Sequence, residues 1–280
     1  MKIKVLTGPQ GGGKSAAMRK EVIANPGLYL FALPTRDLIK EQVADFFAAA
    51  PWLETLPVYS APGRSGTARR LKEAREDLER CGVKHAVIFT THATLLDHPL
   101  DGFSGWHARI DEAPNSVKAG RMNIAVATRD WLKTSFDLVR GPDDEWAAIR
   151  FKGKAPEWKA VERDAAASAL KEFIAEARRP ERVFVHATSW DEKDDIGWFS
   201  LWTPLALSEF ASVVVAGSAY TDSIGFKVAQ DLFEERLGVE IVNRRPKGTP
   251  YRRAKGTPFV EQRDGYDGRA VRAGCGVGRA

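Results

Sequence analysis

The chain has 280 residues, of which 44% are hydrophobic and 28% are charged, an ordinary composition for a globular protein with a substantial core. Two cysteines, Cys81 and Cys275, are too few for a disulfide framework or a four-ligand zinc site, so we expect free thiols in a reducing cytoplasm. No apolar run approaches the length of a membrane span, and the first residues lead straight into a predicted strand rather than a signal peptide.

The net charge of +5 is unevenly distributed along the chain. Residues 243–280 contain ten Lys/Arg and three Asp/Glu, a net charge of +7, so residues 1–242 carry −2. The composition therefore does not indicate a uniformly basic nucleic-acid-binding surface on the body of the chain.

The first predicted elements are a buried strand at residues 3–7 and a helix at residues 16–24. Between them, residues 8–15 read Gly-Pro-Gln-Gly-Gly-Gly-Lys-Ser, which fits the phosphate-loop pattern in its expected strand–turn–helix context. Glycines let backbone N–H groups turn toward a phosphate, and the helix N-terminus adds partial positive charge. Lys14 is expected to reach the β- and γ-phosphates, and the Ser15 hydroxyl to bind Mg²⁺. The predicted nucleotide-binding residues are Gly8, Gly11, Gly12, Gly13, Lys14 and Ser15.

Strands and helices then alternate, which predicts an α/β fold with a mostly parallel sheet covered by helices on both faces. Thr35 is a candidate N-cap for the second helix, and Gly82 ends the third. The predicted strands cover residues 28–33, 56–59, 85–90, 106–112, 211–216 and 239–242, and the predicted helices cover residues 35–50, 67–80, 91–96 and 224–237.

Residues 113–203 have a looser pattern, and six of the eight tryptophans lie between Trp131 and Trp202. We expect this stretch to be an accessory segment inserted into the main domain at residues 1–242. Its predicted helices are residues 124–139 and 158–177, and its predicted strands lie around residues 182–186 and 198–202.

After residue 242 the apolar periodicity ends, and residues 243–280 are rich in glycine and arginine. Such a composition cannot offset the entropy of ordering, so we predict a poorly ordered basic tail. Two interpretations stay open: an arm that holds nucleic-acid phosphates nonspecifically, or a truncated end of the chain.

Asp111 and Glu112 follow a predicted strand, and ligands bind at the carboxyl ends of strands in open α/β sheets. Given the phosphate loop, we expect Asp111 to contact Mg²⁺ and Glu112 to activate the attacking water. The alternative is a pair of solvated acids at the end of a strand. ATP and Mg²⁺ are thus the expected ligands, and hydrolysis the expected reaction.

Four further stretches resemble motifs of superfamily 2 DEAD/DEAH-box helicases, with phage-encoded members the nearest subgroup. They are Ala-Leu-Pro-Thr-Arg-Asp-Leu at 32–38 with Gln42, Ile-Phe-Thr-Thr-His-Ala-Thr-Leu at 88–95, Asp-Glu-Ala-Pro at 111–114 and Gly-Ser-Ala-Tyr-Thr at 217–221. The resemblance spans roughly residues 1–242. It implies one RecA-like phosphate-loop NTPase domain that couples ATP hydrolysis to translocation along, or unwinding of, a DNA or RNA strand.

The resemblance also implies individual roles. Thr35, Arg36, Thr91 and His92 would contact single-stranded or duplex nucleic acid, and Ser218 and Thr221 would couple hydrolysis to that contact. From the residues alone, Thr35 is equally an N-cap, Arg36 a solvated cation, and His92 a satisfied polar residue at a helix start.

The chain departs from the helicase pattern in three ways. Pro114 stands at the last position of the box, about a hundred residues separate Asp111 from Gly217, and nothing after Val242 resembles a second RecA-like domain. We therefore expect a motor half-site that is either truncated or completed in trans by a second RecA-like domain or subunit. Two alternatives stay open: another phosphate-loop ATPase, such as a phage packaging or assembly motor, and a small-molecule kinase or ATP-binding module.

Overall fold

The computed structural model describes residues 1–60, 66–98, 100, 102–124, 126–139, 145–153, 168–177, 183–192, 195–233 and 238–243. Most of the predicted tail (244–280), the first part of the predicted helix at 158–177 and the last residues of the helix at 224–237 lie outside these ranges. The chain forms two compact units. Unit 1 comprises residues 1–114, 204–222 and 235–280, and unit 2 comprises residues 115–203 and 223–234.

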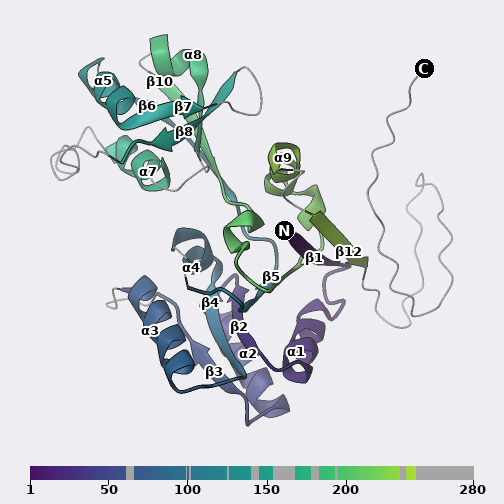
Figure 1. The fold of residues 1–280 in the computed structure, drawn as a ribbon. Coiled ribbons are helices and arrows are strands. Elements are labelled where there is room, and N and C mark those ends of the chain that lie inside the picture. The colour runs from purple at the N-terminus through teal and green to yellow at the C-terminus, as the bar shows by residue number, and fades with distance from the viewer. Residues whose placement is uncertain are drawn as a thin grey trace, which may run out of the picture. The chain divides into compact units, whose positions relative to one another are not determined.

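Unit 1 contains a seven-stranded sheet in which every strand pair is parallel (Figure 1). Its strands are β1 (Lys2–Thr7), β2 (Leu28–Leu33), β3 (Glu54–Pro57), β4 (Ala86–Thr91), β5 (His107–Asp111), β11 (Ser212–Ala216) and β12 (Gly238–Asn243). Their order across the sheet is β12-β1-β11-β5-β2-β4-β3. The predicted α/β class with a parallel sheet is therefore confirmed.

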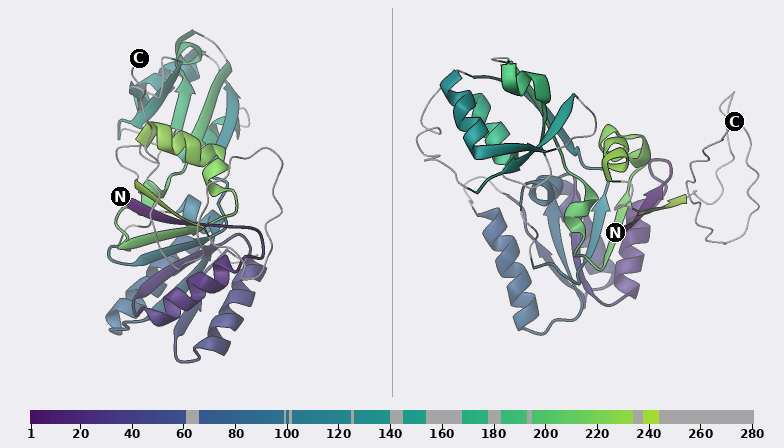
Figure 2. Two further views of the ribbon diagram at one scale, coloured as in Figure 1. Left: turned by 90° about the vertical axis from the view of Figure 1, so that its right-hand side faces the viewer. Right: turned by 45° about the horizontal axis from the view of Figure 1, so that its top comes forward.

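Helices cover this sheet on both sides, as the continuous apolar runs of β2 and β4 require for strands buried on both faces. They are α1 (Lys14–Ala24), α2 (Arg36–Ala49), α3 (Thr67–Arg80) and α4 (His92–Asp97). α1 and α2 enclose one core, in which the rings of Phe31, Phe46 and Phe89 pack with centroids 5.3–6.1 Å apart. α3 lies on the opposite side of the sheet from α1 (Figure 2).

Unit 2 is built on a five-stranded antiparallel sheet in the order β6-β10-β9-β8-β7. Side chains alternate along each strand, so that Val183 and Val185 enter one core and Phe184 enters another on the other face. The strands are β6 (Val117–Asn123), β7 (Phe136–Val139), β8 (Trp146–Phe151), β9 (Val183–His186) and β10 (Asp195–Leu201). The helices are α5 (Val126–Ser135), α7 (Ser168–Ala177), α8 (Ala187–Glu192) and α9 (Ile224–Phe233).

The structure corrects several predicted elements of this second unit. The helix predicted for residues 124–139 ends at Ser135, and Phe136–Val139 is instead strand β7, because it pairs with β8. Strands β6 and β8 and helix α8 were not predicted. β6 reads Val-Lys-Ala-Gly-Arg-Met-Asn, a weak strand pattern, but all seven residues pair with β10.

The 3₁₀ turns η2 (Pro204–Leu207) and η3 (Tyr220–Asp222) belong to unit 1, whereas α9 belongs to unit 2. Asn243, where the predicted tail begins, is the last residue of β12. In the part of the chain that the structure describes, no helix is long and apolar enough to cross a membrane.

Candidate functional site

The loop between β1 and α1 has a backbone that requires glycine. Gly11 and Gly13 have φ angles of +75° and +72°, in the left-handed region that side chains disfavour. At Gly12 the constraint is space: a Cβ there would lie 2.9 Å from the carbonyl oxygen of Pro9, which accepts a hydrogen bond from the Gly12 N–H at 3.0 Å. The three consecutive glycines are therefore needed for the shape of this turn.

The loop ends in the N-terminus of α1, where positive charge is concentrated. The Lys14 ammonium donates to the carbonyl oxygens of Gly8 and Pro9 at 3.0 and 2.9 Å, so it lies against the loop. Gly13 is the N-cap and offers no side-chain hydrogen bond to the first turn. The uncapped N–H groups and the helix dipole together favour an anion at this position.

Ser15 and Asp111 come together although they are far apart in the sequence. Asp111, only 8% exposed, ends β5, and its carboxylate accepts a hydrogen bond from the Ser15 hydroxyl. Burial raises the pKa of Asp111, while the bond from Ser15, the charge of Lys14 and the Glu112 N–H oppose that rise. The two side chains supply hard oxygen ligands, which fits Mg²⁺ held by few protein oxygens and by substrate phosphates.

Glu112 is exposed and has a φ angle of +65°. Among the residues that the structure describes, every other residue with a positive φ is a glycine. Its backbone N–H donates to the carboxylate of Asp111. A left-handed backbone costs a glutamate on the order of 1 kcal/mol or more, and such strain concentrates at functional sites. The conformation places consecutive acids in different settings, one buried and one exposed to solvent.

The loop after β11 lies next to both parts of this site. The N–H of Gly217 donates to the carbonyl oxygen of Leu6 in β1 at 3.0 Å. A Cβ on Gly217 would lie 3.5 Å from the backbone nitrogen of Ala113, directly after Glu112. Ser218 is exposed, and Thr221 is half-buried in η3. These two predicted coupling residues thus come just after Gly217, which lies next to the ends of β1 and β5.

At the end of β2, Thr35 is the N-cap of α2: its side-chain oxygen accepts from the Leu38 N–H at 3.2 Å, which confirms the N-cap interpretation. Arg36 is exposed, and its guanidinium lies 3.5 Å from the carbonyl oxygen of Ser60. The contacts of Thr35 and Arg36 with nucleic acid stay predictions.

At the end of β4, Thr91 and His92 make contacts within unit 1. Thr91 is buried and caps α4 by accepting from the Thr94 N–H at 3.3 Å. The Nε2 atom of His92 lies 2.9 Å from the carbonyl oxygen of Asp111. Burial lowers the pKa of His92 to about 4, so its ring is neutral at physiological pH. The interpretation of His92 as a satisfied polar residue at a helix start is confirmed.

Asn243 also lies at this edge, although no sequence pattern predicted it there. β1 and β12 pair in register from Lys2 to Thr7, and the Thr7 hydroxyl donates to the Asn243 side-chain oxygen. Thr7 immediately precedes the loop at residues 8–15, so Asn243 lies beside it. No local signal marks this position, because only the pairing of the first and last strands brings it there.

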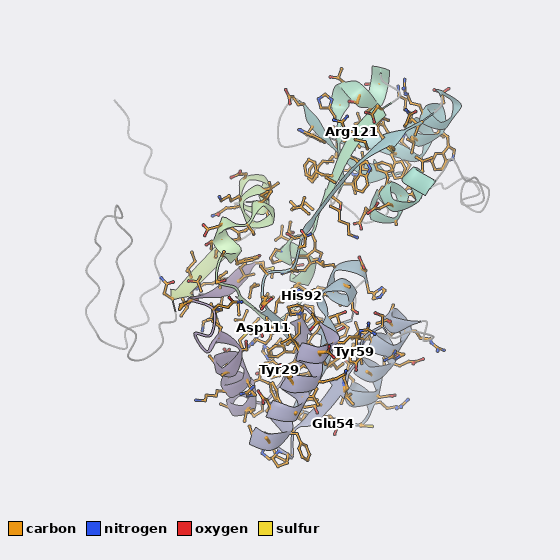
Figure 3. All side chains as sticks on the ribbon, turned by 180° about the vertical axis from the view of Figure 1, so that it is seen from behind. Tyr29, Glu54, Tyr59, His92, Asp111 and Arg121 are labelled. Carbon is orange, nitrogen blue, oxygen red and sulfur yellow. The ribbon has the colours of Figure 1, made fainter. Side chains whose placement is uncertain are left out.

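The predicted site residues lie at or just after the carboxyl ends of the parallel strands β1, β2, β4, β5 and β11, so they share one edge of the sheet. Figure 3 labels His92 and Asp111 at this edge and Glu54, which begins β3, toward the opposite edge. No protein-family model matches the chain, and no curated protein matches it.

Proposed function

We propose that unit 1 is a RecA-like phosphate-loop ATPase domain of DEAD/DEAH helicase type, which binds ATP with Mg²⁺ and couples its hydrolysis to a nucleic-acid strand. The observation that carries this proposal is the hydrogen bond from Ser15 to the buried carboxylate of Asp111. It brings a hydroxyl of the phosphate loop and an acid of β5 to one point, beside the charge of Lys14. Those three groups are what a nucleotide–metal site requires.

Hydrolysis assigns a role to each side chain. Lys14 and the N-terminus of α1 would neutralise charge on the phosphates, and Ser15 and Asp111 would hold Mg²⁺, which would supply further positive charge. The Glu112 carboxylate takes a proton from the attacking water, whose oxygen forms a bond to the γ-phosphorus. The bond from that phosphorus to the bridging oxygen breaks, and ADP leaves.

The strand order supports a RecA-like arrangement. β11 lies between β1, which carries the phosphate loop, and β5, which carries the acids. Its loop, with Ser218 and Thr221, is therefore next to both halves of the ATP site. A change in the γ-phosphate can be transmitted through that loop, as coupling of hydrolysis to movement requires.

Nucleic acid would bind across the loops that follow β2 and β4. Exposed Arg36 would contact phosphates, with Thr35, Thr91 and His92 in the same two loops. The strand is DNA or RNA. A second RecA-like domain or subunit would complete the ATP site in trans by supplying an arginine to the transition state.

The decisive experiment measures ATP hydrolysis by the chain with and without single-stranded DNA or RNA, beside a Lys14→Ala variant. We expect ATP–Mg²⁺ to bind, slow hydrolysis that the strand stimulates, and loss of hydrolysis in Lys14→Ala. Hydrolysis in the wild-type protein that does not exceed that of Lys14→Ala would rule out the ATPase proposal.

One observation favours a second candidate function. This candidate is a phosphate-loop ATPase that is not a helicase, such as a phage packaging or assembly motor. Thr35, Thr91 and His92 each have a partner within unit 1 that accounts for the residue without nucleic acid. This candidate predicts hydrolysis that single strands leave unchanged, and an ATP-dependent ring detectable by sedimentation.

A further inference from the structure

We propose that His92 is a positioning residue, which holds the Asp111–Glu112 turn in its catalytic shape through the carbonyl group of Asp111. This inference rests on the proposed ATPase function and gives His92 a task different from contact with nucleic acid. Its basis is the 2.9 Å distance between Nε2 of His92 and the Asp111 carbonyl oxygen.

The contact bridges two strands that are not neighbours. β2 lies between β4 and β5 in the sheet, with Leu33 in register with Thr91 on one side and Ala32 with Ile110 on the other. The imidazole therefore reaches past the end of β2 to the end of β5. Because Thr91 caps α4, it fixes the helix start from which His92 extends.

The chemistry of the two groups determines the direction of the hydrogen bond. A carbonyl oxygen can only accept, so Nε2 of His92 must carry the proton and donate it. The contact therefore fixes a proton on Nε2 of His92.

The bond acts on the peptide group that joins Asp111 to Glu112. The Asp111 carboxylate accepts from Ser15 and from the Glu112 N–H, and His92 holds its carbonyl, so the two acceptor groups of this residue are fixed. Glu112 follows with its φ angle of +65°. Without His92, this peptide group can rotate toward an ordinary conformation, which moves the Glu112 carboxylate away from the attacking water.

The test compares His92→Leu, which removes the donor, with His92→Gln, whose side-chain amide can donate from a similar position. Basal ATP hydrolysis is measured without nucleic acid. We expect kcat to fall by about 100-fold in His92→Leu, the order of loss that misplacement of a catalytic group by about 1 Å can cause. The KM for ATP should stay unchanged, because the phosphate loop is untouched, and His92→Gln should restore most of kcat.

Two measurements test the positioning role independently of turnover. Hydrogen–deuterium exchange at the Glu112 amide should speed up in His92→Leu and return toward wild type in His92→Gln. In the wild-type protein, ¹⁵N NMR of the imidazole should show a proton on Nε2. If the wild-type protein proves to have no ATPase activity, the proposed function fails, and these two readouts still decide whether His92 holds the turn.

Three results would overturn the inference. One is a wild-type His92 ring that carries its proton on Nδ1. Another is His92→Leu with wild-type exchange at Glu112. The third is a His92→Leu variant that loses affinity for single-stranded DNA or RNA while its basal kcat is unchanged, since that would make His92 a strand contact.

Discussion

Buried Arg109 in β5 forms an ion pair with the partly exposed Glu21 in α1, with 3.1 Å between Nη2 and Oε1. Arg109 also donates to the carbonyl oxygen of Ala108 at 2.9 Å and to the Ser212 hydroxyl at 3.0 Å. Its guanidinium carbon lies 5.2 Å from the centre of the Tyr29 ring. These partners explain how an arginine can occupy an interior position of the strand that carries Asp111.

The ion pair leads to a prediction about stability. Glu21→Ala leaves the buried Arg109 cation without its carboxylate, and we expect a loss of about 2 kcal/mol in the free energy of unfolding, less than for a fully buried pair because Glu21 is partly exposed. Urea denaturation measures this loss. The double variant Glu21→Leu/Arg109→Met should lie closer to the wild type. A Glu21→Ala variant as stable as the wild type would show that solvent already satisfies Arg109.

The stability of unit 1 should fall in mild acid, and His107 contributes to that fall beside His92, whose pKa burial also lowers. Burial, and secondarily the charge of Arg109, lowers the pKa of His107 below its ordinary value of 6.5, while Glu21 opposes the shift. The unfolded chain therefore takes up a proton on this residue before the folded protein does. The contribution of His107 to stability is present above about pH 6.5 and is lost as the pH falls toward the folded pKa.

Urea midpoints from pH 7.5 down to pH 5 test this prediction. His107→Asn retains a group that can bond to Ser212 at the place of Nδ1, which lies 2.9 Å from the Ser212 oxygen, but it cannot be protonated. We expect a shallower loss of stability in acid for this variant. An unchanged pH dependence in His107→Asn would assign the acid sensitivity to other groups.

The glycine-rich loop at residues 8–15 should be more sensitive to a methyl group at Gly12 than its backbone angles alone suggest. In Gly12→Ala the new Cβ meets the Pro9 carbonyl oxygen at 2.9 Å, a backbone atom that cannot move without reshaping the loop. We expect ATP affinity, measured by calorimetry, to fall at least about tenfold, the equivalent of about 1.4 kcal/mol.

Gly82→Ala is the matched control for that experiment. Gly82 has a φ angle of +67° and no atom within 4 Å of a Cβ, and it lies just after the end of α3. The substitution should cost about 1 kcal/mol of stability through backbone strain and leave ATP affinity unchanged. Equal affinities for Gly12→Ala and the wild type would show that the loop tolerates the methyl group.

Substitutions at Thr35 and Arg36 should have different effects: we expect Thr35 to stabilise the fold and Arg36 to bind the nucleic-acid strand. Thr35→Ala removes the N-cap hydrogen bond to Leu38 and should lower the free energy of unfolding by about 1 kcal/mol, whereas Thr35→Ser should restore it. Arg36→Ala should leave stability within about 0.5 kcal/mol of the wild type because the side chain is exposed.

Binding of labelled single-stranded DNA or RNA at several salt concentrations completes this comparison. Arg36→Ala should weaken binding and reduce its salt dependence, because one phosphate contact is lost. If Arg36→Ala binds the strand like the wild type, Arg36 is only a solvated cation at the helix start.

Local sequence patterns predicted every strand of the unit 1 sheet, although β3 lies at Glu54–Pro57 rather than at residues 56–59, and the turns η2 and η3 were not predicted. The predicted bounds of α3 and β2 agree with the structure because a capped, charged helix and a fully apolar strand are each specified by their own residues. In unit 2 such signals were weak. Phe136–Val139 continues a helical pattern, yet it is a strand because pairing with β8 outweighs propensity.

The features of the candidate site likewise fall into those that local sequence determines and those that depend on the tertiary structure. The sequence by itself determined the glycine-rich turn at residues 8–15, the cap at Thr35 and the place of the acids at 111 and 112 at a strand end, because glycine spacing, capping chemistry and strand ends are properties of adjacent residues. Only the tertiary structure decided that Ser15 bonds to Asp111, that His92 holds the Asp111 carbonyl and that Asn243 lies beside Thr7. These contacts depend on the order of strands in the sheet, which long-range packing sets and which no stretch of local sequence encodes.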